Sequence, residues 1–467
     1  MHWDKRPGKA PDAIPQTEKL IDRERKPMNL NLGCPVLCEG DEGYEAARRV
    51  WNGMIDRRPR WIVRPRSIAD VMQAVRGASE SSLPICVRGG GHSFSGKSVA
   101  DGALMVDLSL MKSIQVDPRS RTVIAQGGVK LGEFDAETEK YGLATTGGVI
   151  STTGIAGLTL GGGLGWLMGK HGLTCDNLIS ADLVDAGGRH LSASATENPD
   201  LFWAIRGGGG NFGIVTAFEY QLHPLDSVHG GVMLYPRDKA KELIRQYRDI
   251  TLTAPDELTA YAALLTGHGT PMAAIAMCHS GEPVTAERET RQFLLADAPI
   301  ADMTGKKKYT EIQSMMDFSA PAGLNYYSKC PFLRELTDGA MDTIIAHAAA
   351  APTEQTQVVI EHMHGAASRV AADATAFGLR RVHYSVNIMA AWDNPALAES
   401  CIAWARGLAT ALEAFGASDT YVNYLGDEGA AAVKASYGPN YDRLARLKHK
   451  YDPENVFRFN QNIVGAA

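Results

Sequence analysis

The run Arg88-Gly89-Gly90-Gly91-His92-Ser93 combines residue types that could bind an anion beside a nucleophile. Three consecutive glycines expose backbone N–H groups, and a phosphate can approach them closely because no side chain intervenes. The imidazole of His92 follows at once, with the hydroxyl of Ser93 beside it. Residues 84–87 predict a short buried strand that holds the histidine at a strand end. The run therefore indicates a nucleophile next to a phosphate-bearing cofactor.

A second group with possible chemistry is Glu361-His362-Met363-His364. On a strand, His362 and His364 point to one face and could chelate one metal ion. No third ligand is visible nearby in the sequence. Core packing, the lining of an organic-substrate pocket and a metal centre all remain open at this point.

Tyr424 and the cysteines have both structural and chemical interpretations. In the stretch Tyr421–Gly426, strand alternation puts Val422 and Tyr424 on one face, where the tyrosine could pack or act as an acid, base or hydrogen-bond donor. Cys175 is a lone thiol, either structural or reactive. Cys34 and Cys38 could form a disulfide, but the seven scattered cysteines favour reduced thiols.

Several common nucleotide and hydrolase motifs are absent or misplaced. Gly208-x-Gly210-x-x-Gly213 matches the dinucleotide fingerprint as a string, but that motif needs a strand before it and a helix after it. Here the sequence predicts the reverse, with a helix over 200–206 and a strand over 214–220. The chain contains neither a P-loop nor a G-x-S-x-G nucleophile elbow.

The predicted secondary structure and the glycine content both change near residue 225. Before it, the pattern predicts an α/β region rich in glycine, with an ordered, ligand-facing loop over 147–165. After it, glycine becomes sparse. The predicted helices cover 43–57, 67–71 onward, 200–206, 238–251, 284–295, 396–414 and 442–450. The predicted strands cover 61–63, 85–87, 104–108, 113–116, 122–126, 181–186, 214–220, 273–278, 358–364 and 384–390.

Composition excludes some classes of partner. The 467 residues carry 47 basic and 53 acidic side chains, a net charge of −6, which argues against a nucleic-acid partner. No run reaches the roughly 18 apolar residues of a membrane span, so no membrane partner is expected. Residues 1–26 are polar and lack the apolar core of a signal peptide. We expect them to form a mobile arm, and we expect a cytoplasmic location.

The ordered set of motifs resembles the berberine-bridge-enzyme-like branch of the vanillyl-alcohol-oxidase (PCMH-type) FAD flavoproteins. The resemblance covers residues 55–463 and rests on the combination of motifs, since each glycine cluster alone is a weak signal. The N-terminal motifs are Val87–Ser93, Val106–Ser109, Gly127–Val129, Gly161–Gly165, Gly172–Asn177, Leu201–Gly209 and Asn211–Thr216. The C-terminal motifs are Asn440–Leu444, Tyr451–Phe457 and Asn460–Ile463.

The resemblance implies an α+β fold. It comprises a PCMH-type FAD-binding domain of two α/β subdomains and a substrate domain whose antiparallel sheet is covered by helices. The implied division is an N-terminal arm over 1–40, the FAD domain over 41–225, the substrate domain over 226–420 and a C-terminal segment over 421–467 that returns to the FAD domain. The change in glycine content near residue 225 agrees with the main boundary.

The resemblance also implies covalent FAD. His92 is expected to be bonded to the 8α-methyl carbon of the flavin, with Arg88 or backbone amides stabilising the charge that develops on the ring. Some members carry a second, cysteinyl link, but the matching position here is Val149 or Ile150, so only the histidyl link is expected. Cys175 is expected near the cofactor but unbonded.

The resemblance implies FAD contacts from the FAD domain and from the C-terminal segment. They are the loop Arg88–Ser93 for the pyrophosphate; Gly148, Ser151, Thr152, Thr153 and Gly154 for the flavin and ribityl side; Gly157 and Gly161 in the same loop; Ile214 and Val215 for the adenine side; and Asn460 and Gln461 over the ring system.

The implied function is an FAD-linked oxidase. An alcohol or amine C–H of a small organic substrate gives its hydride to FAD, and oxygen then takes the electrons and yields hydrogen peroxide. The candidate bases are Tyr424, His362 and Glu361, in that order, although strand alternation lets only one of Glu361 and His362 face the flavin. The alternatives are a dehydrogenase with another acceptor, a flavin-binding protein without turnover, and a metalloenzyme that uses Glu361, His362 and His364.

Overall fold

The N-terminal part of the chain builds a small sheet around a β-α-β crossover. The computed structural model describes residues 32–465, so the expected mobile arm over residues 1–26 lies outside the described residues. Helix α3 (Ile68–Glu80) begins as predicted, because Ser67 caps it and Asp70 completes a capping box. The crossover lets β2 and β3 pair with β4 in parallel. The strand order is β1 (Val36–Leu37), β2 (Trp61–Val63), β4 (Leu104–Asp107) and β3 (Ile85–Arg88).

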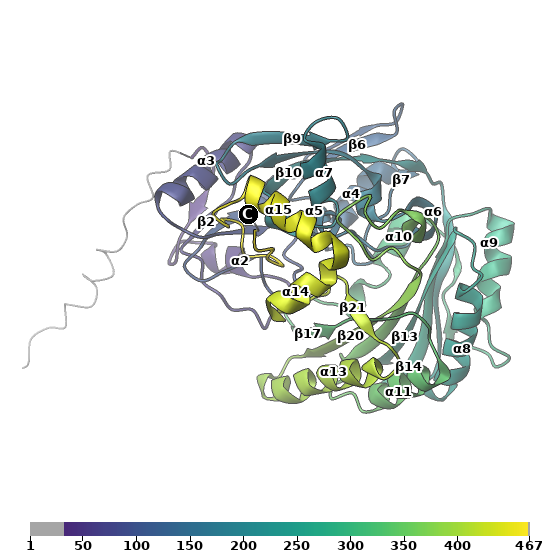
Figure 1. The fold of residues 1–467 in the computed structure, drawn as a ribbon. Coiled ribbons are helices and arrows are strands. Elements are labelled where there is room, and N and C mark those ends of the chain that lie inside the picture. The colour runs from purple at the N-terminus through teal and green to yellow at the C-terminus, as the bar shows by residue number, and fades with distance from the viewer. Residues whose placement is uncertain (1–31, 466–467) are drawn as a thin grey trace, which may run out of the picture. The chain divides into compact units, whose positions relative to one another are not determined.

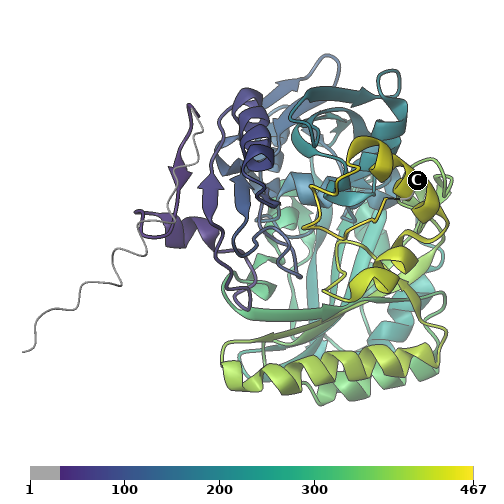
Figure 2. The same ribbon diagram turned by 60° about the vertical axis from the view of Figure 1, so that its left-hand side comes forward.

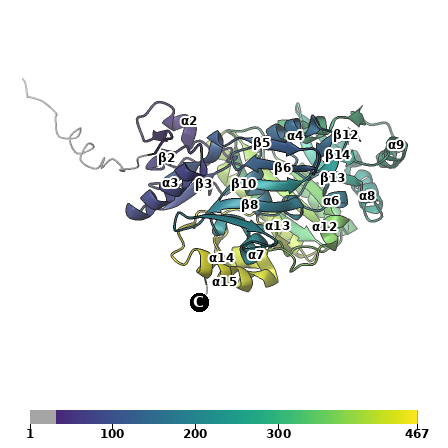
Figure 3. The same ribbon diagram turned by 90° about the horizontal axis from the view of Figure 1, so that it is seen from above.

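A second sheet of five antiparallel strands follows, with β10 at its centre. Figure 3 shows β5, β6, β10 and β8 side by side. The order is β5 (Ile114–Asp117), β6 (Thr122–Gln126), β10 (Ile214–Gln221), β8 (Leu178–Val184) and β9 (His190–Ser194). A separate pair joins β7 (Leu143–Ala144) to β11 (His223–Pro224). The helices of this part are α4 (Leu131–Glu139), α5 (Ile155–Leu160), α6 (Met168–His171) and α7 (Pro199–Ile205).

The third sheet is large and antiparallel, and its ten strands come from residues 228–420. Its main path is β15 (Ala301–Asp302), β12 (Val228–Pro236), β14 (Thr270–His279), β13 (Leu258–Gly267), β19 (Gln357–Met363), β20 (His383–Trp392), β18 (Pro331–Leu333) and β21 (Ser418–Thr420). Strand β16 (Gly305–Lys307) pairs with β12, and β17 (Asn325–Lys329) pairs with β20. The expected α+β architecture, with an antiparallel sheet in the substrate domain, is confirmed.

Helices cover one face of the large sheet. Figures 1 and 2 show α11 (Asp338–Ala349) and α13 (Ala398–Glu413) running along it, and α8 (Ala240–Thr251) packs into the same core. On β19 and β20 this face carries Ile360, Val386 and Ile388. The alternate side chains face the other way, toward the N-terminal sheets. The remaining helices here are α9 (Pro283–Thr290), α10 (Tyr309–Ser314) and α12 (Ala366–Arg369).

The C-terminal segment returns to the N-terminal part of the chain. Helix α15 (Tyr441–Tyr451), yellow in Figure 1, lies beside α7, α14 (Gly429–Tyr437) contacts β21, and the segment after α15 is hydrogen-bonded to Asn211. None of the described helices is long and apolar enough to cross a membrane. Cys34 and Cys38 form no disulfide.

Two predicted elements are wrong, and tertiary contacts explain both. The helix predicted over 43–57 is only α2 (Tyr44–Arg48). The chain beyond it is held by the large sheet, because the Asn52 side chain exchanges two hydrogen bonds with the backbone of Tyr326. The stretch Tyr421–Gly426, predicted as a strand, contains no strand and instead forms a turn in which the Tyr424 N–H donates to the Tyr421 carbonyl.

Candidate active site

A cavity of about 370 Å³ lies between the first two sheets and the face of the third sheet opposite α8, α11 and α13. We call this face the roof. Most of the predicted site residues line the cavity. They are Gly89, Gly90, Gly91, His92, Ser93, Gly148, Thr153, Gly154, Gly157, Ile214, Val215, Glu361, Tyr424, Asn460 and Gln461. Five do not: Arg88, Ser151, Thr152, Gly161 and His362.

The glycine loop sits directly against a second backbone segment. A Cβ atom added to Gly90 would lie 2.2 Å from the Gly154 nitrogen, and one added to Gly154 would lie 2.3 Å from the Gly90 nitrogen. Only glycine fits at either position. The two loops therefore form a joint cradle of bare backbone, which suits a phosphate-bearing cofactor.

A polar group that the C-terminal segment brings to the cavity also fits a cofactor. The Asn460 amide donates to the carbonyls of Gly210 and Phe457. Its Oδ1 is buried and accepts no hydrogen bond from any residue in the described part of the chain. A buried acceptor left open in this way suits an N–H or O–H donor supplied by a bound ligand. The residues present therefore fit FAD.

His92 lines the cavity as a neutral, oriented imidazole. Its Nε2 lies 2.9 Å from the Thr152 hydroxyl oxygen. Its ring stacks on Trp51, with 5.2 Å between ring centroids and 16° between planes. Burial, helped by the positive charge of Lys130, lowers the pKa of His92 to about 4. The ring is therefore uncharged at neutral pH and keeps a lone pair on one nitrogen.

Arg88 has a structural role in place of the predicted electrostatic one. Its guanidinium donates to both carboxylate oxygens of the buried Asp107, at 3.0 and 2.6 Å, and to the Arg49 carbonyl. These bonds hold the side chain away from the cavity, at the start of the glycine loop. The expectation that the Arg88 side chain stabilises charge on the cofactor is therefore corrected.

Glu361, buried on the roof, and Tyr424, in the turn that follows β21, form an acid–base pair. The Tyr424 hydroxyl donates to Glu361 Oε1 at 3.0 Å, and Ser385 Oγ donates to Oε2 at 2.8 Å. Burial raises the pKa of Glu361 to about 7, although both hydrogen bonds oppose the rise. Burial and the adjacent Glu361 charge raise the pKa of Tyr424 well above its ordinary value. Near neutral pH the carboxylate is thus the better proton acceptor, which reverses the predicted order of the two.

His362 points away from the cavity, so its predicted role as base is wrong. It pairs with Tyr384 on the helix-covered face and stacks on that ring, with 4.7 Å between centroids. Neither ring nitrogen has a partner among the residues that the structure describes. Strand alternation therefore selects Glu361 rather than His362 for the roof.

The predicted alternative of a metal centre is also wrong. Glu361 and His362 lie on opposite faces of β19, so they cannot hold one ion together. His362 and His364 stack with 5.3 Å between ring centroids, and Gly169 lies against His364. Over residues 32–465, no group of three or more His, Cys, Asp or Glu side chains is arranged to hold a metal ion.

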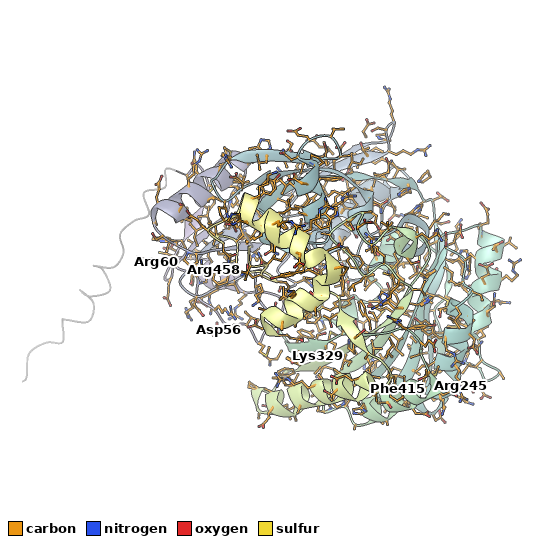
Figure 4. All side chains as sticks on the ribbon, in the orientation of Figure 1. Asp56, Arg60, Arg245, Lys329, Phe415 and Arg458 are labelled. Atoms are coloured by element: carbon orange, nitrogen blue, oxygen red, sulfur yellow. The ribbon has the colours of Figure 1, made fainter. Side chains whose placement is uncertain are left out.

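Charged pairs hold the segment that carries Tyr424. Lys97, beside the glycine loop, binds Asp427 at 2.8 Å, and Lys329 of β17, labelled in Figure 4, binds Glu428 at 2.7 Å. The Gln461 amide donates to the Leu425 carbonyl at 2.7 Å. These contacts hold the turn at Tyr424 against both N-terminal and roof elements, although Tyr424 lies in no strand.

Several cavity residues were not predicted. Gln357 and Asn387 line the cavity on β19 and β20 and follow from counting alternate positions outward from Glu361. Trp51, predicted as helix core, also lines it. Asp317 anchors the Ser151 loop and carries no local sequence signal. Cys175 does not line the cavity, because it is buried beside Asp176 and Arg380, and this corrects its expected place near the cofactor.

Comparison with known proteins identifies the family. The FAD binding domain model matches residues 59–194, and the model described as berberine and berberine like matches residues 420–464. An FAD-linked oxidoreductase of Dictyostelium discoideum is 34% identical over 92% of this chain and 94% of its own length. The (R)-6-hydroxynicotine oxidase of Paenarthrobacter nicotinovorans is 30% identical over 93% and 99%.

The solved structures agree with the sequence comparison. The crystal structure of 6-hydroxy-D-nicotine oxidase from Arthrobacter nicotinovorans matches with a TM-score of 0.85 and 29% identity, over 93% of this chain and 98% of that one. The match includes the N-terminal sheets, the roof and the returning C-terminal segment. The chain belongs to the berberine-bridge-enzyme-like family of FAD-linked oxidoreductases.

Proposed function

We propose that the protein is an oxidase that acts on an alcohol or amine group of a small organic substrate. The observation that carries the proposal is the hydrogen-bonded Glu361–Tyr424 pair, which lines the same cavity as the glycine loop and His92. Bound FAD would accept the hydride of the substrate C–H bond, and dioxygen would regenerate it with release of hydrogen peroxide.

Glu361 and Tyr424 would remove the second hydrogen of the substrate as a proton. The Tyr424 hydroxyl oxygen accepts a hydrogen bond from the substrate O–H or N–H while its own proton lies on the bond to Glu361 Oε1. As the substrate proton moves to Tyr424, the tyrosine proton moves to the carboxylate. Glu361 is thus the final acceptor, and Ser385 keeps its second oxygen in place.

A single covalent bond from His92 to FAD is part of the same proposal. His92 lines the cavity and is uncharged at neutral pH, as a nucleophile must be. Val149 and Ile150 line the cavity where a second, cysteinyl link would start, and neither can form one.

The test is a panel of alcohols and amines, including hydroxylated N-heterocycles because a relative is named for such a compound. Substrates are recognised by anaerobic bleaching of the flavin spectrum, and admitted air then restores the colour with one peroxide per substrate. Bleaching with slow reoxidation and no peroxide would instead identify a dehydrogenase with another acceptor.

Two variants test the proton path. E361Q and Y424F should each slow anaerobic flavin reduction by about 10² to 10⁴, the usual contribution of general acid–base catalysis. The matched control is Y327F, because Tyr327 accepts a hydrogen bond from Arg406 outside the cavity. Reduction of E361Q at the wild-type rate would remove Glu361 from the mechanism.

A further inference from the structure

The roof presents a row of side chains that leads away from Glu361 along β19 and β20. Gln357, Val359 and Glu361 line the cavity from one face of β19, and Asn387 and Met389 line it from β20. We call these five residues the roof strip. Asn387 pairs with Val359, and Met389 pairs with Gln357. Because a strand rises about 3.4 Å per residue, the Asn387 pair lies about 7 Å along the strands from Glu361 and the Gln357 pair about 14 Å. The strip is therefore long enough for two linked rings.

The Gln357 amide is fixed with its oxygen free. Its Nε2 donates to the Ser319 carbonyl at 3.1 Å, and since a carbonyl can only accept, the nitrogen must be the atom that points to Ser319. Within residues 32–465 no group donates to Oε1, and this atom is not one of the buried, unpartnered polar atoms. Because the side chain lines the cavity, Oε1 is open to a donor supplied by a ligand.

The Asn387 amide presents a free donor closer to Glu361. Its Oδ1 accepts a hydrogen bond from the Ser328 hydroxyl of β17 at 3.3 Å. Its Nδ2 has no partner in the part of the chain that the structure describes, and it is not one of the buried, unpartnered polar atoms. Asn387 and its partner Val359 are half-buried although they lie on adjacent inner strands of the large sheet, so their exposed area belongs to the cavity.

The cavity offers no free cation to a substrate. Among the described residues that line it, Lys97 is the only lysine or arginine, and its ammonium is paired with Asp427 at 2.8 Å. A carboxylate or phosphate of the substrate would therefore be buried without a counterion, in the same cavity as the Glu361 carboxyl group. The site selects against anionic substrates.

Aromatic rings line the cavity beside both ends of the roof strip. Trp51 lies near the Gln357 end, because its Nε1 donates to the carbonyl next to the one that Gln357 binds. Phe94 packs edge-on against Tyr424 at the other end, with 6.3 Å between ring centroids. Val359 adds an apolar surface between them. These walls suit flat aromatic rings. A sugar, with a hydroxyl on nearly every carbon, would leave most of its hydroxyls without a partner on the strip.

We propose that Gln357 and Asn387 determine the specificity of the site for a substrate of two linked aromatic rings that is uncharged apart from its reacting group. The reacting alcohol or amine lies at Glu361. An ether or carbonyl oxygen near the link between the rings accepts from Asn387 Nδ2, and a hydroxyl or N–H at the far end donates to Gln357 Oε1. The inference rests on the proposed oxidase function and adds the length and polarity of the substrate.

The first test compares four matched probes on the holoenzyme. The parent probe is benzyl alcohol with a para-hydroxyphenoxy group at its para position, which supplies an ether oxygen and a terminal hydroxyl. The second probe has a methylene group in place of the ether oxygen, the third lacks the terminal hydroxyl, and the fourth carries a carboxylate there. The parent should bleach the flavin anaerobically at the lowest concentration. Each lost hydrogen bond should raise the half-saturating concentration about fivefold, and the carboxylate probe should bind most weakly. Equal affinity for all four would overturn the inference.

The second test assigns each preference to a residue. N387L, which keeps the size and removes the donor, should bind the ether and methylene probes equally. Q357M should bind the probes with and without the terminal hydroxyl equally. A purely structural role would weaken the binding of all probes alike. The matched control is N325L, since the Asn325 amide donates to the Asp393 carbonyl outside the cavity, and it should keep both preferences. A preference that survives in its variant would overturn the role of that residue.

The same measurements separate this inference from the proposed function. If other alcohols or amines bleach the flavin and none of the four probes does, the substrate class is overturned and the proposed oxidase stands. If no alcohol or amine bleaches it, the proposed oxidase is itself contradicted.

Discussion

At the scale of single residues, the site depends on a carboxyl group whose charge changes near neutral pH. Glu361 is buried, accepts two hydrogen bonds and has a pKa raised to about 7 by burial. Below that pH the group is protonated and cannot accept a proton from Tyr424. Above it, the carboxylate is available. Proton transfer from Tyr424 to Glu361 therefore becomes faster as the pH rises through the pKa of Glu361.

The first prediction concerns this pH dependence. Anaerobic flavin reduction should rise with pH through an apparent pKa near 7, and E361Q should lose that limb of the profile because an amide does not titrate in this range. Stopped-flow reduction across the pH range measures it. The same rising limb in E361Q would assign the titration to another group.

The second prediction concerns the contact between the two glycine loops. In G154A the added methyl would lie 2.3 Å from the Gly90 nitrogen, although the backbone angles at Gly154 are ordinary for alanine. The loops must separate, so the FAD content of purified protein should fall severalfold. The control is G407A, where a Cβ meets nothing within 4 Å. Full FAD occupancy in G154A would show that the cradle tolerates the displacement.

At the scale of elements, period-two alternation places the roof residues. Glu361 and Tyr261 share one face of paired strands, whereas His362 and Tyr384 share the other. The sequence predicts that Glu361 and His362 must separate, but it does not show which face α8, α11 and α13 cover. That choice depends on packing between elements far apart in the chain.

Local sequence signals predict helices and strands well in regular segments. They predict poorly where contacts between distant residues determine the conformation. Ser67 and Asp70 predict the start of α3, and the glycine runs predict the loops around the cavity. The short helix α2 and the turn at Tyr424 could not be predicted, since contacts such as Asn52 with Tyr326 join residues 274 positions apart. Asp317, which binds the Ser151 loop across 166 residues, lacks a signal for the same reason.

The third prediction tests a buried carboxyl group between α4 and α10. Asp135 accepts from the Gln313 amide, and its Oδ1 has no partner in the described chain. Burial raises the pKa of Asp135 to about 7. The folded state therefore binds this proton more tightly than the unfolded state. Its stabilising contribution is full below about pH 4 and is lost as the pH rises through 7.

Wild type should thus lose more stability than D135N between pH 5 and pH 8, by about 3 kcal/mol, because roughly two pKa units at about 1.4 kcal/mol each lie between pH 5 and the pKa of Asp135. Urea unfolding at several pH values measures the difference. The exposed D342N serves as the control and should parallel wild type. Equal pH slopes for D135N and wild type would mean that Asp135 titrates normally in the fold.

At the scale of the whole described chain, the site is assembled from three distant parts. The glycine loop and Gly154 come from the N-terminal sheets, Glu361 from the roof, and Asn460 and Gln461 from the last residues. Asn211 links the last part to the first, since its amide donates to the Gln461 carbonyl and its Oδ1 accepts from the Ile463 N–H. The cavity is therefore complete only when the C-terminal segment has returned.

The fourth prediction tests what holds that segment. Lys448 and Asp452 are both fully buried, and their charged groups bond at 2.6 Å. Lys448 also donates to the carbonyls of Asn211 and Phe457, and Asp452 accepts from the backbone N–H groups of Val456 and Phe457. One buried ion pair thus fixes α15 to the segment that carries Asn460 and Gln461.

In K448M the Asp452 carboxylate remains buried without its counterion, which should cost about 3–5 kcal/mol of stability. The same change should lower the amount of FAD that the protein incorporates, because Asn460 and Gln461 lose their support. K450M is the matched control on the same helix. Lys450 pairs with Asp200 at the surface, where such a pair contributes about 1 kcal/mol or less. Thermal unfolding and the FAD content of the purified protein measure the two effects. If K448M and K450M behaved alike, the buried pair would not be what holds the C-terminal segment over the cavity.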